Sequence, residues 1–205
     1  MRLYAKLTQP QLAILHVLYL TPHLSSTFNR KPKSISLKAS SFQTLLTIDE
    51  QQRVMSGIAI EAISRNASNA FTAIASAILP FVFLAKHDPV EAIREPFVET
   101  WSENTGGTGA IKLYIREIMI LIAGRLEDPQ WRIKQVSASA LADACETIGV
   151  DIREHLSLVM PLLLKGTGGR TWKGKEAVLK ALVVVAENAK DYLPPKDVDE
   201  ISKVH

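Results

Sequence analysis

The chain of 205 residues is 47% hydrophobic and 22% charged, with one cysteine and a formal net charge of +3. This composition excludes a chain that is disordered throughout, and a single thiol excludes a disulfide framework or a cysteine-based zinc site. The length suits one domain or one section of a larger array. Residues 1–48 hold six basic side chains and no acidic one, so the remainder carries a net −3. A mildly acidic body does not favour a nucleic-acid partner.

Residues 1–48 form a basic, acid-free leader that is rich in serine and threonine. An apolar run, Leu12–Leu20, follows two basic residues, as in a secretory signal, but Pro10 and His16 interrupt it and no clear cleavage site follows. An organelle transit peptide also fits this composition. The third interpretation is a flexible or atypical start, including a gene-model artefact, that does not join the fold. These interpretations stay open at this stage.

Residues 66–85 contain no charged side chain, and about 20 such residues could cross a bilayer. However, several polar residues and Pro80 dilute the apolar content, and much of the rest is alanine. We therefore expect a buried helix hairpin and no membrane span.

The body of the chain shows apolar residues at helical spacing. The clearest segment is 133–148, and segments 111–126 and 176–190 show related patterns. In 133–148 the apolar face consists of Ile133, Val136, Ala140, Leu141, Ala144, Cys145 and Ile148, opposite Arg132, Gln135, Ser139, Asp143 and Glu146. No long alternating segment indicates strands.

The turns between these segments recur with a period near 40 residues. Asp88-Pro89 and Asp128-Pro129 are 40 residues apart, and Pro80 and Pro161 are separated by 81, or two periods. Trp131 and Trp172, 41 apart, are expected to occupy equivalent packing positions. In each Asp-Pro pair we expect the aspartate to cap a helix and the proline to occupy its first turn.

Two helices in a unit of about 40–47 residues are typical of HEAT or armadillo arrays. We predict an all-α fold, a HEAT/armadillo-like α-solenoid of about four helix pairs over residues 49–193. Residues 194–205 are predicted to form a short terminal helix or tail, with a short charged helix over Asp197–Val204.

The glycine-rich segment Gly166–Glu176 partly matches a phosphate-binding loop, with Gly169, Gly174 and Lys175 at the required spacing. Glu176 stands where a serine or threonine would hold magnesium, and a helical pattern precedes the loop instead of a strand. We therefore expect an inter-helix turn with glycines at positive φ. The loop also concentrates basic side chains that are candidate contacts for an acidic partner, although a solvated loop is the simpler interpretation: Lys165, Arg170, Lys173 and Lys175.

The sequence holds no catalytic constellation. Its five histidines are scattered, without a second ligand at metal-binding spacing, and Cys145 lies on an apolar helix face, as expected for a core thiol. We expect no enzyme activity, no catalytic residue, no cofactor and no metal.

Five segments, in this order, resemble the Ecm29 family of proteasome adaptor and scaffold proteins. They are ILPFVFLAKH (78–87), FVETWSEN (97–104), GGTGAIKLY (106–114), WRIK (131–134) and GRTWKGKE (169–176). The family's version of the last segment is very similar, and the resemblance covers about residues 55–193 and nothing in 1–48.

This resemblance implies a section, from the C-terminal half, of a large HEAT-repeat protein that bridges the proteasome core and regulatory particles and takes part in proteasome quality control. The implied partners are subunits of both particles, with no small-molecule substrate, and the implied location is cytoplasm and nucleus. Residues 1–48 would instead direct the chain to an organelle if they act as a transit peptide. Two alternatives stay open: another HEAT-type adaptor such as a transport receptor, and a nucleotide-hydrolysing enzyme that uses Gly169–Lys175.

Overall fold

The computed structural model describes residues 45–47, 49–106 and 109–203, so the predictions for nearly all of the leader lie outside the described residues. The described residues fold into α-helices and short 3₁₀ segments with no strand, which confirms the all-α prediction. The α-helices are α2 (Glu50–Asn66), α3 (Ser68–Thr72), α4 (Ala75–Ala85), α5 (Glu91–Asn104), α6 (Gly109–Leu126), α7 (Trp131–Ile148), α8 (Leu156–Thr167), α9 (Lys175–Ala189) and α10 (Pro195–Ile201). The 3₁₀ segments are η3 (Gly149–His155) and η4 (Lys190–Tyr192).

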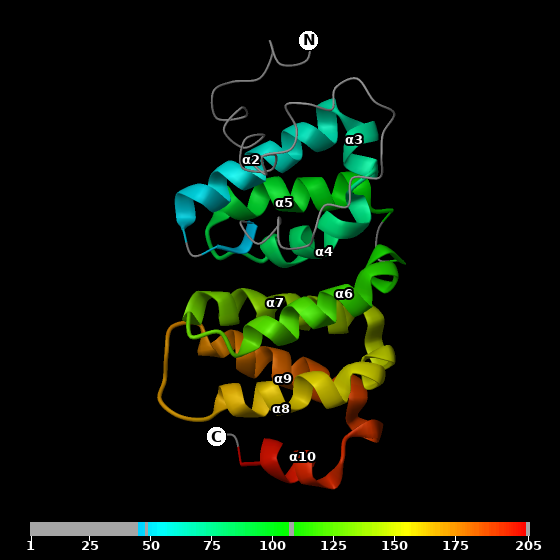
Figure 1. Ribbon diagram of the computed structural model, residues 1–205. Helices are drawn as coiled ribbons and strands as arrows, with labels where there is room; N and C mark the ends of the chain where they lie inside the picture. Colours follow the sequence, from blue (N-terminus) through cyan, green and yellow to red (C-terminus); the bar gives the residue numbers. More distant parts are fainter. Residues whose placement is uncertain (1–44, 48, 107–108, 204–205) are drawn as a thin grey trace.

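The helices follow one another as stacked pairs from α2 to α10 (Figure 1). Helices α4, α6 and α8 are the first helices of three pairs and pack against one another, while α5, α7 and α9 are the second helices. Helix α2 packs on α5, so the described residues contain three complete pairs and three further helices, α2, α3 and α10, where the sequence indicated about four pairs. This layered order is the arrangement expected for an α-solenoid.

The predicted apolar faces form the core. In α7, six of the seven predicted residues are buried and Ile133 is half-buried. Ala138 and Ala142, outside the predicted face, are buried too, because α7 contacts α4 and α6 as well as α9. Small side chains at these positions let neighbouring helices approach closely, so this helix is covered over a wider arc than its pattern indicated.

The uncharged segment 66–85 forms α3 and α4, and residues 78–85 are all buried within the helix stack. None of the described helices combines the length and the apolar character that a membrane span requires. The segment thus has the predicted character of a buried pair of helices.

The repeat period is kept in some positions and lost in others. Pro80 and Pro161 are each the sixth residue of their helices, α4 and α8. Trp131 is the first residue of α7, whereas Trp172 precedes α9 by three residues, so the prediction of equivalent positions is wrong. The α8–α9 loop is the reason, since it places the starts of α7 and α9 44 residues apart instead of 40 or 41.

The Asp-Pro pairs lie just before the helices. The carboxylates of Asp88 and Asp128 accept hydrogen bonds from the N–H groups of Val90 (2.9 Å) and Gln130 (2.8 Å). Val90 and Gln130 have extended backbones and are the N-cap residues, so each proline precedes the helix instead of occupying its first turn. The aspartates therefore close the turn into each helix.

Asp88 also joins three parts of the fold. Its side chain is 3% exposed, and Oδ2 accepts from Arg53 Nε of α2 (3.0 Å) and from Arg132 Nη2 of α7 (2.5 Å). Arg53 is itself 3% exposed, and its Nη1 donates to the carbonyl oxygen of Thr47 (2.7 Å). Such a buried pair is costly to break, because removal of one partner leaves an uncompensated charge.

We predict that Asp88→Ala lowers the free energy of unfolding by about 3–5 kcal/mol, because two guanidinium groups lose their buried carboxylate. Asp128→Ala is the matched control one period later, where the carboxylate makes its hydrogen bond within the turn, and a loss of about 1 kcal/mol is expected. Urea denaturation followed by circular dichroism measures both values. Equal losses in the two variants would show that the contacts with Arg53 and Arg132 add no net stability.

Candidate partner-binding site

Three of the four predicted basic side chains make contacts within the protein. Lys165 Nζ, at the end of α8, lies 2.5 Å from Glu127 Oε1. Lys173 Nζ lies 5.0 Å from the centre of the Trp131 ring, a cation–π contact. Lys175 Nζ donates to the carbonyl oxygens of Gly168 and Gly169, at 3.5 and 3.3 Å.

Arg170 differs from these three lysines. It is exposed at the tip of the α8–α9 loop, and no ion pair or hydrogen bond of its side chain is seen with a described residue. The structure thus holds the loop against the start of α7 and presents Arg170 outward. The contact of these four residues with an acidic partner stays a prediction.

Two of the four glycines in this loop have the predicted positive φ, whereas Gly166 lies in α8 and Gly168 has φ −70°. Gly169 has φ +73° and Gly174 has φ +94°, both in the region that side chains other than glycine rarely adopt. The element before the loop is helix α8, whereas a phosphate-binding loop follows a strand. The loop is an inter-helix turn, as predicted.

We predict that Gly174→Ala destabilises the protein more than Gly169→Ala. Both substitutions place a Cβ at positive φ, at a cost of about 1–2 kcal/mol. At Gly174 the new Cβ would also lie 2.8 Å from the side-chain carboxamide carbon of Gln135, while at Gly169 it meets open space. Thermal unfolding of the two variants compares these costs, and an equal loss in both would contradict the close contact with Gln135.

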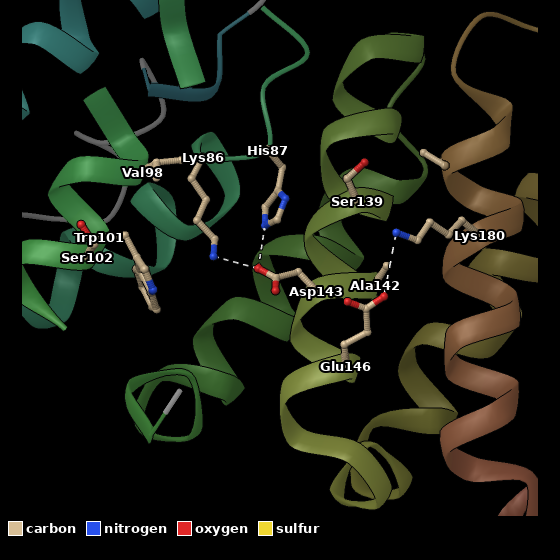
Figure 2. A pocket seen from close by; sticks show the side chains of 11 residues that line it. Lys86, His87, Val98, Trp101, Ser102, Ser139, Ala142, Asp143, Glu146 and Lys180 are labelled. Atoms are coloured by element: carbon tan, nitrogen blue, oxygen red, sulfur yellow. Dashed lines mark ion pairs between the residues drawn. The ribbon is translucent and has the colours of Figure 1, made fainter. Parts of the chain in front are cut away.

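A groove of about 460 Å³ lies between α5 and α7, with α9 at one side (Figure 2). It forms because the close packing of α7 on α9 is not repeated between α5 and α7. Three of the five side chains predicted to lie opposite the apolar face of segment 133–148 belong to its wall on α7, together with Ala142: Ser139, Asp143 and Glu146. These three therefore line a groove between repeats.

Asp143 is the centre of the charges in this groove. Its Oδ2 lies 2.8 Å from Lys86 Nζ and 3.1 Å from His87 Nε2, both from the α4–α5 turn (Figure 2). Burial alone would raise the pKa of Asp143, but His87 and Lys86 outweigh it and lower the pKa to about 2. The ionised carboxylate thus links the turn to α7 across the groove.

Aromatic rings fix the position of Lys86. Its Nζ lies 4.5 Å from the centre of the Phe83 ring and 5.4 Å from that of Trp101, and these two rings pack edge to face at 5.0 Å. Such cation–π contacts stabilise a partly desolvated ammonium group. The groove therefore combines an ordered cation, an ordered anion and the aromatic side chain of Trp101 at one surface.

His87 lies beside these charges, with 17% of its side chain exposed. Burial lowers its pKa below the usual value of 6.5, an effect that the contact of its Nε2 with the Asp143 carboxylate only partly offsets, and Lys86 and Lys180 act in the same direction as burial. A histidine with a lowered pKa in the folded state stabilises the fold while it is neutral. That contribution is lost as the pH falls below 6.5 and through the lower folded-state pKa.

We predict that the free energy of unfolding of the unmodified chain declines as the pH falls below 6.5, and that His87→Asn makes this decline less steep. The reason is that folding no longer has to keep a buried imidazole neutral. Urea denaturation at several pH values between 7 and 5 tests this expectation. His155→Asn, in η3, is the control and should keep the full decline; an unchanged slope in His87→Asn would contradict the assignment.

Sequence patterns alone did not identify this groove. The histidines are scattered along the chain, and Asp143 was placed on a helix face that had no assigned neighbour. Lys86 and His87 end the first of the five segments that resemble the Ecm29 family, and that resemblance was the one indication available. The contact of these residues with Asp143 joins parts of the chain more than 50 residues apart, so only the fold shows it.

Neither a reactive cysteine nor a metal site is found among the described residues. Cys145 is fully buried, and burial raises the pKa of its thiol to about 12, so it is a core side chain. Among the described residues, no group of histidine, cysteine and carboxylate side chains is arranged to hold a metal ion.

The curated proteins that are similar to this chain are all Ecm29 proteins. The human "Proteasome adapter and scaffold protein ECM29" is 30% identical over 135 residues, which cover 62% of this chain and 7% of the human protein. The resemblance to the Ecm29 family is confirmed. "Proteasome component ECM29" of Saccharomyces cerevisiae is 27% identical over 143 residues, covering 69% of this chain and 8% of the yeast protein. "Proteasome component ecm29" of Schizosaccharomyces pombe is 27% identical over 154 residues, covering 75% of this chain and 9% of that protein.

The matched part of this chain therefore spans less than a tenth of the length of these Ecm29 relatives. No protein-family model matches it. No solved structure matches it either.

Proposed function

We propose that this chain is a non-catalytic scaffold segment that associates with proteasomes, as a section of a HEAT-repeat adaptor linking core and regulatory particles. The observation that carries the proposal is the similarity to Ecm29 proteins, whose names describe a proteasome component, adaptor and scaffold. The stacked helix pairs support it, because such arrays offer extended binding surfaces. A section from the C-terminal half, a role in assembly or quality control, and a cytoplasmic and nuclear location belong to the same proposal.

The contact surface in this proposal is the edge where the two helices of each pair are joined. The α4–α5, α6–α7 and α8–α9 connections lie together there, since Asp88 contacts Arg132 and Lys165 contacts Glu127. Arg170 is exposed on this edge, and its guanidinium group can bind a carboxylate through two parallel hydrogen bonds. A subunit with an acidic surface is the partner that such an edge would recognise.

We predict that the tagged full chain captures core- and regulatory-particle subunits from cell extract, and that moderate salt weakens this capture. Arg170→Glu should reduce the recovered subunits about fivefold, because reversal of an interfacial charge costs about 1 kcal/mol or more. Quantitative mass spectrometry of the bound proteins measures the recovery. Arg116→Glu, an exposed site on α6, is the control and should recover the same amount as the unmodified chain.

A folded chain that captures no proteasome subunit at either salt concentration would contradict the proposal for this chain. Capture of transport factors in place of proteasome subunits would favour the alternative of a different HEAT-type adaptor. Equal effects of Arg170→Glu and Arg116→Glu would exclude Arg170 as a specific contact.

A further inference from the structure

A second, smaller pocket of about 150 Å³ lies on the same edge, between the α4–α5 turn and the start of α7. Its charged lining consists of three arginines, Arg53, Arg125 and Arg132, and one carboxylate, Asp88. Leu46, Ala85, Trp131, Ile133 and Val136 supply its apolar wall. The lining therefore carries a net positive charge, and the pocket is large enough for a side-chain carboxylate.

The start of α7 lies in this pocket, with Gln130, Trp131 and Arg132 in its lining. Helix α7 has 18 residues, and no described side chain caps its N-terminus, since Asp128 instead accepts from the N–H group of Gln130. The first turn of a helix carries backbone N–H groups without helical partners and a partial positive charge. Both features favour an anion at this end of the pocket.

Arg53 supplies an independent observation. It is 97% buried, its Nε and Nη1 have partners, and its Nη2 has no hydrogen-bond partner. A buried donor of this kind costs free energy unless a bound group accepts from it. Arg125 lies in the same pocket, and its Nη1 donates to the carbonyl oxygen of Leu121 (3.5 Å). Burial lowers the pKa of its guanidinium group and the charge of Asp128 only partly offsets this, so an additional anion would offset more of that desolvation.

We propose that this pocket binds the carboxylate of a glutamate or aspartate side chain from an acidic segment of a protein partner. The proposal rests on the proposed function to the extent that the partner is a protein. The carboxylate accepts from Arg53 Nη2, from Arg125 and from the first-turn N–H groups of α7. Trp131, 37% exposed beside the pocket, packs on the backbone of the partner segment.

A carboxylate suits this lining better than a phosphate group. Asp88, itself a carboxylate, already contacts two of the three arginines and shows that their geometry accepts this group. Its negative charge opposes a dianion more strongly than a monoanion. The apolar wall also favours a group carried on a methylene chain.

The test is titration of the isotope-labelled full chain with the blocked peptide Ac-Gly-Glu-Gly-NH₂, followed by NMR. We expect saturable shifts of the Trp131 indole N–H and of backbone N–H groups in the first turn of α7. Arg125→Gln should weaken the Kd about tenfold, because a hydrogen bond to a charged group is worth about 1.5–3 kcal/mol. Arg116→Gln, the same substitution on the exposed face of α6, should keep the Kd within about twofold, as expected for a distant surface charge.

Three results would overturn the proposal: equal weakening by both substitutions, equal binding of Ac-Gly-Gln-Gly-NH₂, or tighter binding of inorganic phosphate at the same ionic strength. Circular dichroism of both variants confirms that folding is kept; if Arg125→Gln is unfolded, Trp131→Ala replaces it with the same expectation. The peptide titration is independent of the capture experiment. Binding of the peptide without capture of proteasome subunits would support the carboxylate site and contradict the proposed function. Capture of proteasome subunits without binding of the peptide would support the proposed function and contradict the carboxylate site.

Discussion

The carboxylate of Asp88 joins α2, the α4–α5 turn and α7 through ion pairs of its buried side chain with Arg53 and Arg132. Helices α5 and α7 are separated by the groove, so the first two complete pairs are joined by the packing of α4 on α6 and α7 together with polar contacts of the α4–α5 turn. These polar contacts are made by Asp88 with Arg132, and by Lys86 and His87 with Asp143. They add a charge-dependent contribution to the apolar packing at this junction.

The next junction is of a different kind. Helices α7 and α9 pack closely on one another, and both bury small and branched apolar side chains, such as Ala140 on α7 and Leu182 on α9. Apolar burial changes little with pH or ionic strength, whereas partly exposed ion pairs weaken with salt and titrate with their members. The polar contacts of the α4–α5 turn are therefore expected to respond more to solution conditions than the packing of α7 on α9.

Features that depend on residues close together in the sequence could be predicted, and contacts between residues far apart in the sequence could not. The apolar faces of α7 and α9 and the positive φ values at Gly169 and Gly174 are local properties, and the sequence pattern predicted them correctly. The partners of Asp88 are 35 and 44 residues away and lie on different helices, so no local pattern indicates them. The error over Trp131 and Trp172 has a similar cause, since a constant period cannot show that one inter-helix loop is longer than another.

The same topology separates the charges of a body that is mildly acidic as a whole. Exposed glutamates follow one face of α5 at intervals of four residues, from Glu91 to Glu103, where Arg65 of α2 neutralises part of their charge. The turns that join the two helices of each pair lie at a different surface from this acidic face. That surface is the edge that carries Arg125, Arg170 and Lys173. Because every pair adds its turn to that edge, charged side chains distant in sequence gather there, and the acidic Asp88 and Glu127 pair with Arg132 and Lys165. The exposed Arg170 is the side chain of this edge at which the proposed acidic partner would bind, despite the net negative charge of the body.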